Sequence, residues 1–183
     1  MFPPGHAGFS VAIAFALEHS FGRNVLATGE STGAQMRNKW RIDYRLVILG
    51  SLLPDILDKA LEIGGLPGRS FGHTILLGAL LIFLGVTAIR STGVRAPLVL
   101  GLFSAGHLLL DRMWESPETI LWPLLGLSFG GVEHNFSPPW LRWVQLGMGR
   151  LALEAIGAFV LVTLAVWLYR RRTIHKWFKT GMG

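Results

Sequence analysis

The sequence predicts an all-α membrane protein, a polytopic helical bundle of about five transmembrane helices in one integral membrane domain covering residues 1–183. Three observations predict this class. Apolar residues make up 51% of the chain and charged residues only 15%, whereas a soluble domain carries about 25% charged residues. Mean hydropathy is +0.46. Apolar runs long enough for helical spans recur along the chain.

Five apolar runs give the expected spans, and glycine, proline and charge clusters mark their ends. The runs cover residues 6–21, 46–63, 73–90, 96–113 and 151–169. Pro54 lies inside the second run and predicts a kink or a half-helix. The fifth run is the cleanest, since its only charge is Glu154.

Three segments connect or follow these spans. Residues 22–45 form a basic loop, expected on the cytoplasmic side, and residues 170–183 form a basic cytoplasmic tail. Residues 115–145 form an outer loop that contains a short apolar segment at 120–132. That segment is too short for an ordinary span, so we expect it to be re-entrant or interfacial.

The basic residues predict the orientation, because cytoplasmic loops are enriched in Lys and Arg. With the tail inside, five spans place 12 of the 17 basic residues on the inner side. The C-terminus is therefore expected in the cytoplasm of a multi-pass cytoplasmic membrane protein. Basic residues spread over short loops and a tail suit an anionic lipid surface, so no nucleic acid partner is expected.

This topology brings six ionisable side chains to one level, near the outer interface. They are His6, Asp55, Asp58, His73, His107 and Asp111. Ionisable groups at such depth are costly and are usually functional or paired. A bound divalent cation is the simplest way to satisfy three carboxylates and three imidazoles together. The chain has no cysteine, so a metal site must use nitrogen and oxygen ligands.

The spacings of these residues also favour a shared site. Asp55 and Asp58 stand at i, i+3, and His107 and Asp111 at i, i+4, so each pair shares one helix face. Two neighbouring helices that each present such a pair can build a metal site in a bundle core. His73 is expected at a helix start, where the positive helix end favours a neutral imidazole.

Each group also has an ordinary interpretation. A single histidine inside a membrane protein is about as often hydrogen-bonded to a neighbouring helix. Asp58 beside Lys59 fits a solvated helix end, and Asp111 beside Arg112 fits an interfacial charge patch. Their common depth favours the shared site over these separate readings.

Four motifs in order resemble the YdjM-like family of membrane-bound metal-dependent hydrolases. They are GHAGFS at 5–10, GSLLPDILDK at 50–59, GRSFGHTILLG at 68–78 and GHLLLDRMWESPETILWPLLG at 106–126. The family pattern has an N-terminal Gly-His, then Leu-Pro-Asp-Ile-Asp-His, Arg-Gly-x-Thr-His-Ser, and Ser-His-x-x-x-Asp followed by Leu-Trp-Pro. The four motifs together span about two thirds of the chain.

The resemblance implies a set of metal ligands by matching position. They are His6, Asp55, His73, His107 and Asp111. Arg69 matches the arginine of the third motif. The second motif departs from the pattern, because Leu57 stands at its second aspartate and Asp58 at its histidine. Asp58 remains a candidate ligand, since a carboxylate can replace an imidazole.

The resemblance implies a metal-dependent hydrolase, and the site depth predicts its substrate class. Six ligands exceed the three that one catalytic zinc uses, so one or two divalent ions are expected, Zn²⁺ first, with Mn²⁺ or Mg²⁺ as alternatives. An interfacial site suits a lipid or lipid-linked phosphate or phosphodiester, as for a phosphatase or phospholipase C. Arg69 and Arg112 could hold phosphate oxygens, or could only snorkel to lipid headgroups.

His134 could act as a general acid, or could belong to a solvated loop with Glu133. Two non-enzymatic alternatives stay open. One is a small metal or proton transporter, although the third and fifth runs show no polar group at their centres, apart from Thr87 and Thr163 toward the inner ends. The other is a structural membrane protein whose helices a metal ion staples together.

Overall fold

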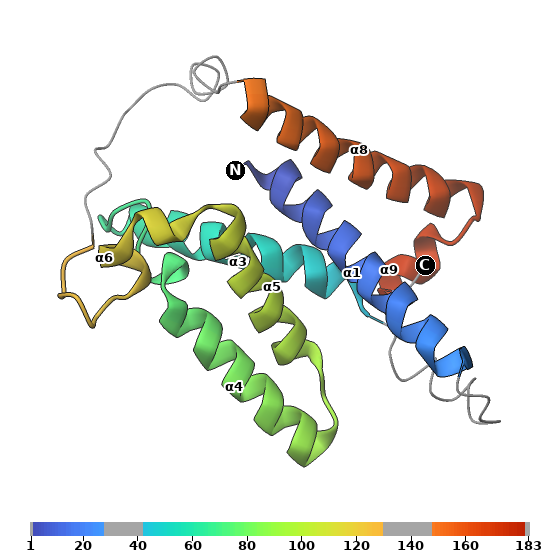
Figure 1. The fold of residues 1–183 in the computed structure, drawn as a ribbon, viewed down its shortest axis with the longest axis horizontal. Helices are drawn as coiled ribbons and strands as arrows, with labels where there is room; N and C mark the ends of the chain where they lie inside the picture. The colour runs from blue at the N-terminus through green and yellow to red at the C-terminus, as the bar shows by residue number, and fades with distance from the viewer. Residues whose placement is uncertain (1, 28–41, 130–147, 182–183) are drawn as a thin grey trace.

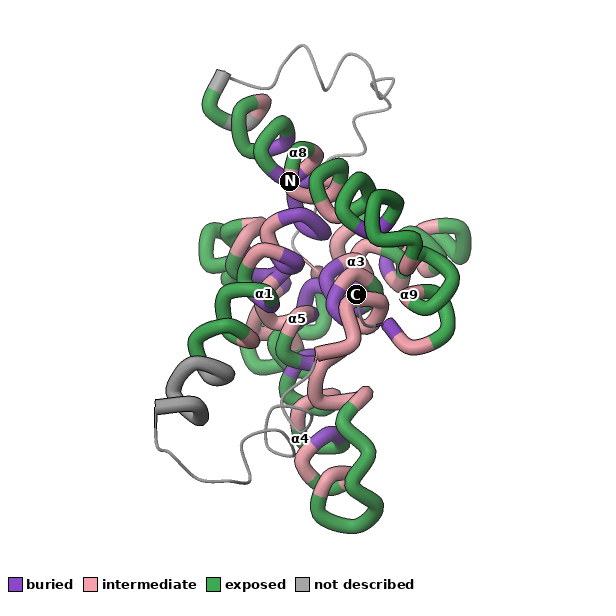
Figure 2. The backbone as a smooth tube through the Cα atoms, turned by 90° about the vertical axis from the view of Figure 1, so that its right-hand side faces the viewer, coloured by how far each residue is buried: buried purple, intermediate pink, exposed green. Residues whose placement is uncertain are grey.

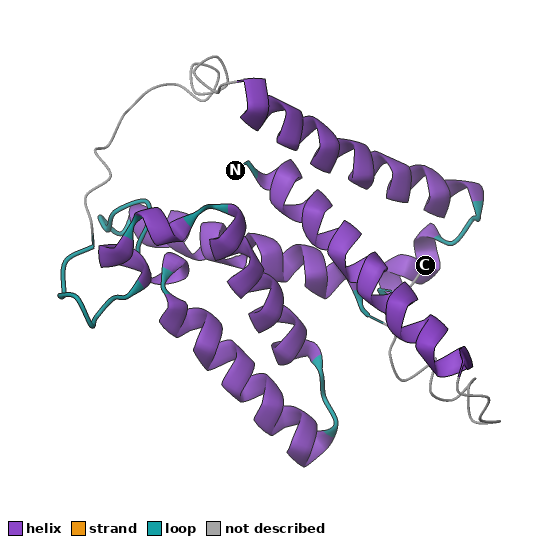
Figure 3. Ribbon diagram, viewed as in Figure 1, coloured by secondary structure: helices purple, strands orange, loops and turns teal. Residues whose placement is uncertain are grey.

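The computed structural model describes residues 2–27, 42–129 and 148–181, and all regular structure in these ranges is helical (Figure 1, Figure 3). The all-α class is therefore confirmed for the described residues. The long helices are α1 (Pro3–Ala27), α3 (Tyr44–Ile63), α4 (Ile75–Thr92), α5 (Ala96–Leu110) and α8 (Met148–Arg170). The short elements are η1 (Phe71–His73), η2 (Met113–Glu115), α6 (Pro117–Ile120) and α9 (Ile174–Thr180).

The long helices occupy the five predicted apolar runs but differ at their ends. α3 is one continuous helix with Pro54 inside it, not two half-helices. α4 begins two residues later than expected because Thr74 is its N-cap, with Oγ1 accepting from the Leu77 amide at 3.3 Å. His73 therefore lies in the 3-10 turn before α4. α5 ends at Leu110, and Arg112 then adopts a left-handed backbone with φ of 55°.

α3 lies at the centre of the bundle, in contact with α1 on one side and α5 on the other. α4 and α5 form an antiparallel pair, whereas α1 and α8 run side by side in the same direction (Figure 1). The buried parts of the backbone gather around α1, α3 and α5 (Figure 2). A small apolar core of Val11, Ala14 and Val47 lies between α1 and α3.

Glycine permits the close approach of α1 and α8. A Cβ atom added to Gly8 would overlap the backbone oxygen of Gly157, and one added to Gly157 would lie 2.6 Å from the Cα atom of Gly5. Small residues at such crossings are typical of helix pairs packed in membranes. α8 is thereby held against the first half of α1, close to His6.

Two described helices, Ile75–Thr92 and Leu151–Arg170, are long and apolar enough to cross a membrane. Only 11% and 17% of their apolar windows are buried, so these helices are not the covered core of a soluble protein. α5 is apolar but has 15 residues, and α3 carries Asp55, Asp58 and Lys59 in its second half. The two helices support membrane insertion, but they do not establish five spans.

Two local structures were not expected from the sequence. The tail contains α9, which packs on the start of α3, where the Tyr44 amide donates to the Gly181 carbonyl at 3.0 Å and Arg45 Nη1 donates to the Phe178 carbonyl at 2.7 Å. The described part of the short apolar segment folds onto η1. Phe71, Trp122 and Phe129 form a ring cluster there, with centroids 4.8–5.3 Å apart.

Candidate metal centre

Five of the six predicted ligands meet at one place, although they come from four separate elements. His6 lies in α1, Asp55 in α3, His73 in η1 and His107 in α5, and Asp111 is the C-cap of α5. Two overlapping groups of side chains could hold an ion, with donor atoms within 4.8 Å of one another. One group is Asp55, His73 and His107, and the other is His6, His107 and Asp111.

The first group forms a nearly equilateral triangle of donor atoms. His73 Nε2 lies 3.3 Å from His107 Nε2. Asp55 Oδ1 lies 3.5 Å from the first of these nitrogens and 3.6 Å from the second. Four ligands placed about 2.0–2.1 Å from one zinc ion in a tetrahedron lie about 3.3–3.4 Å from each other. The triangle therefore has the dimensions of three positions around one such ion.

Asp111 adds a fourth donor atom at a slightly longer distance. Its Oδ2 atom lies 3.8 Å from His73 Nε2 and 4.0 Å from His107 Nε2. Two imidazoles and two carboxylates form a nitrogen and oxygen donor set that suits Zn²⁺ and other divalent first-row metals. The residues present therefore fit a divalent cation in both number and chemistry.

Hydrogen bonds fix the tautomers of the two central histidines. His107 Nδ1 lies 2.7 Å from the Ser51 carbonyl oxygen, and a carbonyl can only accept, so Nδ1 carries the proton. His73 Nδ1 donates in the same way to Asp58 Oδ2, at 2.7 Å. Both rings therefore turn the lone pair of Nε2 toward the centre. Partners of this kind orient imidazole ligands and raise their basicity.

Asp58 supports a ligand and is not part of either converging group. Its two oxygens accept from the Ser70 amide at 2.6 Å, the Ser70 hydroxyl at 2.9 Å and the Gly72 amide at 2.6 Å, besides His73. A Cβ atom on Gly72 would lie 2.8 Å from Asp58 Oδ1, so only glycine permits this turn. The two aspartates at i, i+3 therefore have different roles. Asp55 faces the donor atoms, and Asp58 orients His73.

His6 completes the second group. Its ring stacks on that of His107, with centroids 3.9 Å apart, and its Nε2 lies 3.0 Å from Asp111 Oδ1. Its Nδ1 is buried and has no hydrogen-bond partner among the residues that the structure describes. A buried polar atom without a partner is costly, so this nitrogen marks a place where a ligand would be stabilised.

Neighbouring charged groups shift the pKa values of His73, in the turn before α4, and of Asp111, at the C-cap of α5. Burial alone would lower the pKa of His73, but hydrogen bonds to Asp111 and Asp58 outweigh it and raise the pKa. Burial alone would raise the pKa of Asp111, yet His6 and His73 hold the pKa of that carboxyl far below its usual range. These carboxylates stabilise the protonated form of the His73 ring, which opposes the preference of a positive helix start for a neutral ring. A divalent cation would displace that proton.

The centre is enclosed except at Asp55. The side chains of His6 and His107 are fully buried, and that of Asp55 is 37% exposed. Arg69 Nη2 lies 3.1 Å from Asp111 Oδ2, and the Arg69 side chain is partly exposed. Arg112 forms an ion pair with Glu115. His134 lies outside the described residues.

Sequence reasoning gave no role to Glu154, which positions the start of α1. The carboxylate is buried, and it accepts from the Phe2 amide at 2.7 Å and from the Gly5 amide at 2.9 Å. Amides at a helix start lack partners within the helix and favour an anion. Glu154 thus fixes the turn that carries His6. The sequence did contain a sign of this role, because Glu154 is the only acid in the fifth apolar run.

The fold and the site together define a class: an all-helical protein with apolar helices of membrane-span length and a buried histidine–aspartate cluster. The family described as YdjM inner membrane protein matches residues 1–180, and the chain belongs to this family. The resemblance inferred from the four motifs is confirmed, as is membrane residence. No curated protein and no solved structure matches the chain.

Proposed function

We propose that this protein is a membrane-embedded, metal-dependent hydrolase that cleaves a lipid phosphate or phosphodiester at the outer face of the membrane. The observation that carries the proposal is the triangle of His73 Nε2, His107 Nε2 and Asp55 Oδ1, with sides of 3.3–3.6 Å. Three protein ligands with an open position are typical of catalytic zinc sites, and Asp111 Oδ2 stands outside this triangle, 3.8 and 4.0 Å from the two nitrogens.

The exposure of Asp55 favours a catalytic site over a structural one. A structural zinc site is closed by four protein ligands, whereas a catalytic site keeps a position for water or substrate. The 37% exposure of the Asp55 side chain, beside a fully buried His107, gives one edge of the centre access to solvent or substrate. When bound, a divalent cation would supply Lewis acidity and lower the pKa of a coordinated water.

The chain's own residues would bind and orient the substrate. Arg69 lies beside the donor atoms through Asp111, where a guanidinium can bind phosphate oxygens in a fixed planar geometry. Arg112, which the Glu115 pair holds at the surface, is a second candidate. His134 stays a candidate general acid.

We extend the proposal to the membrane topology. A five-span chain with its C-terminus in the cytoplasm would place the start of α1, the end of α3, the start of α4 and the end of α5 on the outer side. These are the helix ends whose residues converge in the metal centre. The parallel course of α1 and α8 (Figure 1) is also what an odd number of spans requires of the first and last.

Two measurements on one purified preparation test the proposal. Elemental analysis should find a divalent metal, and a panel of phospholipids and polyprenyl phosphates with added Zn²⁺ or Mn²⁺ should yield a hydrolysed product. His107→Ala and Asp111→Ala should abolish both results. His175→Ala is the matched control, because His175 is exposed on α9, and it should change neither.

The results also separate the rival functions. Bound metal that raises thermal stability without any turnover would indicate a structural staple. Metal-stimulated flux into liposomes without hydrolysis would indicate a transporter. A wild-type preparation that binds no divalent metal would exclude the proposed function.

A further inference from the structure

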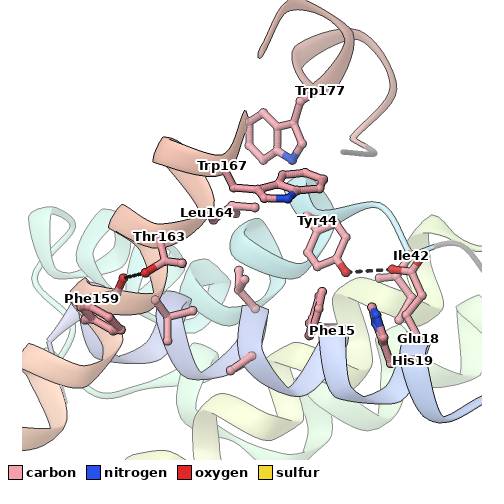
Figure 4. Close-up of a pocket in the computed structure, with 13 residues that line it drawn as sticks. Phe15, Glu18, His19, Ile42, Tyr44, Phe159, Thr163, Leu164, Trp167 and Trp177 are labelled. Atoms are coloured by element: carbon pink, nitrogen blue, oxygen red, sulfur yellow. Dashed lines mark hydrogen bonds between the residues drawn. The ribbon is translucent and has the colours of Figure 1, made fainter. Parts of the chain in front are cut away.

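A cavity lies against the middle of α1, away from the candidate metal centre at the start of that helix. Its volume is about 560 Å³, and it is bounded by α1, the start of α3, α8 and α9 (Figure 4). Phe15 lies nine residues after His6, which is about 14 Å along a helix axis. The volume is within the range of about 300–1,000 Å³ that is usual for small-molecule sites.

The cavity has an apolar body and an aromatic end. Val11, Phe15, Phe159 and Leu164 line its length. At one end the indoles of Trp167 and Trp177 lie next to one another (Figure 4). Such a shape suits a hydrocarbon chain. A polypeptide would bring amide groups that this mostly apolar lining cannot satisfy.

The aromatic end contains a hydrogen-bond donor without an acceptor. Trp177 Nε1 is buried and has no partner among the described residues. An indole N–H can only donate, so the missing partner is an acceptor oxygen. The occupant therefore combines an apolar chain with an oxygen-bearing head.

The same end is basic. The Arg171 guanidinium stacks over the Trp167 ring, 4.7 Å from its centroid. Arg170, Arg172, Lys176 and Lys179 are exposed close by, on the end of α8, in the turn after it and on α9. Asp43 is paired with Arg45 at 2.7 Å, and Glu18, which lines the cavity from α1, accepts from the Tyr44 hydroxyl at 2.8 Å. The charge here complements an anionic head.

We propose that this cavity binds one anionic phospholipid, with an acyl chain between α1 and α8 and with its ester or phosphate oxygens at Trp177 and the basic residues of α8 and α9. Clusters of Lys and Arg next to a membrane helix attract anionic headgroups. The bound lipid would fill the space between the two helices and tie α9 to the bundle. This site is separate from the metal centre and does not depend on hydrolysis.

Native mass spectrometry of the full chain in detergent tests the proposal. The protein is titrated with phosphatidylglycerol and, separately, with phosphatidylcholine of the same acyl chains. We expect one saturable phosphatidylglycerol per chain and weaker binding of phosphatidylcholine. Trp177→Phe removes the donor but keeps a ring, and it should weaken phosphatidylglycerol binding about 2- to 10-fold, the effect of one lost hydrogen bond.

Two further variants and one control complete the design. Thr163→Phe places a ring in the cavity lining and should abolish the saturable complex. Arg171→Gln should reduce the preference for phosphatidylglycerol. His175→Ala, at an exposed position of α9, should bind like the wild type. Thermal unfolding and size-exclusion profiles establish that each variant is folded.

Equal binding of the two lipids without saturation would overturn the proposal, as would wild-type binding by both Trp177→Phe and Thr163→Phe. If Thr163→Phe does not fold, the Trp177→Phe titration decides alone. A preparation without metal or hydrolytic activity that still binds one phosphatidylglycerol would refute the proposed function and leave this site intact.

Discussion

His73 Nδ1 lies 2.7 Å from Asp58 Oδ2, and this contact determines which nitrogen of His73 faces the metal centre. The same carboxylate also accepts from the amides of Ser70 and Gly72, so it fixes the backbone turn as well as the ring. Asp58 and Asp55 share a helix face, but one carboxylate supports a ligand and the other faces the donor atoms.

Replacing Asp58 by Asn should weaken metal binding without removing a ligand. We expect about 10- to 100-fold lower affinity, the usual effect of losing a residue that orients a metal-bound histidine. Asp55→Asn should weaken binding more, because it removes a donor atom. Titration against a chelator of known affinity measures both. Greater loss in Asp58→Asn than in Asp55→Asn would reverse the two roles.

Glu154→Gln should destabilise the start of α1. Hydrogen bonds to a charged acceptor contribute about 1.5–3 kcal/mol each, and the amide retains one acceptor oxygen, so a loss of about 1–3 kcal/mol is expected. Metal affinity should fall with it, because His6 lies in this turn. Thermal unfolding in detergent gives the stability change. Glu115→Gln, at an exposed ion pair, is the control and should lie within about 0.5 kcal/mol of wild type.

Much of the fold and of the site follows from local patterns. Apolar runs locate the ends of the long helices to within about three residues, because hydrophobic length is a property of the segment itself. The exception is α1, which continues to Ala27, six residues into the predicted loop 22–45. The convergence of Asp55, His73, His107 and Asp111 follows from topology, because a chain that reverses direction between helices brings alternate helix ends to one side. The number of spans stays a prediction, since α5 is short and α3 is polar in its second half.

The remaining features depend on contacts between distant segments. Spacing at i, i+3 places Asp58 on the face of Asp55, but only the turn at Ser70 and Gly72 shows that its oxygens are occupied. The capping of α1 by Glu154 joins residues about 150 positions apart. No local pattern encodes such a pair. α9 forms in a segment read only as a basic tail, and it packs on the start of α3.

Gly8→Ala should disrupt the packing of α1 on α8. The added Cβ atom would overlap the backbone oxygen of Gly157, and a backbone atom cannot move aside as a flexible side chain can. Overpacking of this kind costs about 1–3 kcal/mol. We expect a lower melting temperature in detergent and weaker metal binding through His6.

Gly106→Ala provides the contrast for this substitution. A Cβ atom at Gly106 would meet nothing within 4 Å, and alanine is favoured over glycine inside a helix by about 0.5–1 kcal/mol. This variant should therefore be as stable as the wild type or slightly more stable. Equal losses in both variants would show that the contact with Gly157 does not hold α1 and α8 together.

Removing the metal should lower the thermal stability of the wild type. An ion that binds only the folded state stabilises it by about 2.7 kcal/mol when its free concentration is 100 times the dissociation constant. The ion should either bind His6 Nδ1, which has no partner among the described residues, or displace the proton that His73 shares with its carboxylates. In both cases the added stability appears as a higher melting temperature. Melting curves with excess chelator and with added Zn²⁺ measure this difference.

His107→Ala should melt at the same temperature in both conditions, because the variant lacks a ligand that belongs to both groups. His175→Ala should keep the full shift. A wild-type curve that does not respond to either addition would mean that the histidines and aspartates satisfy one another without an ion.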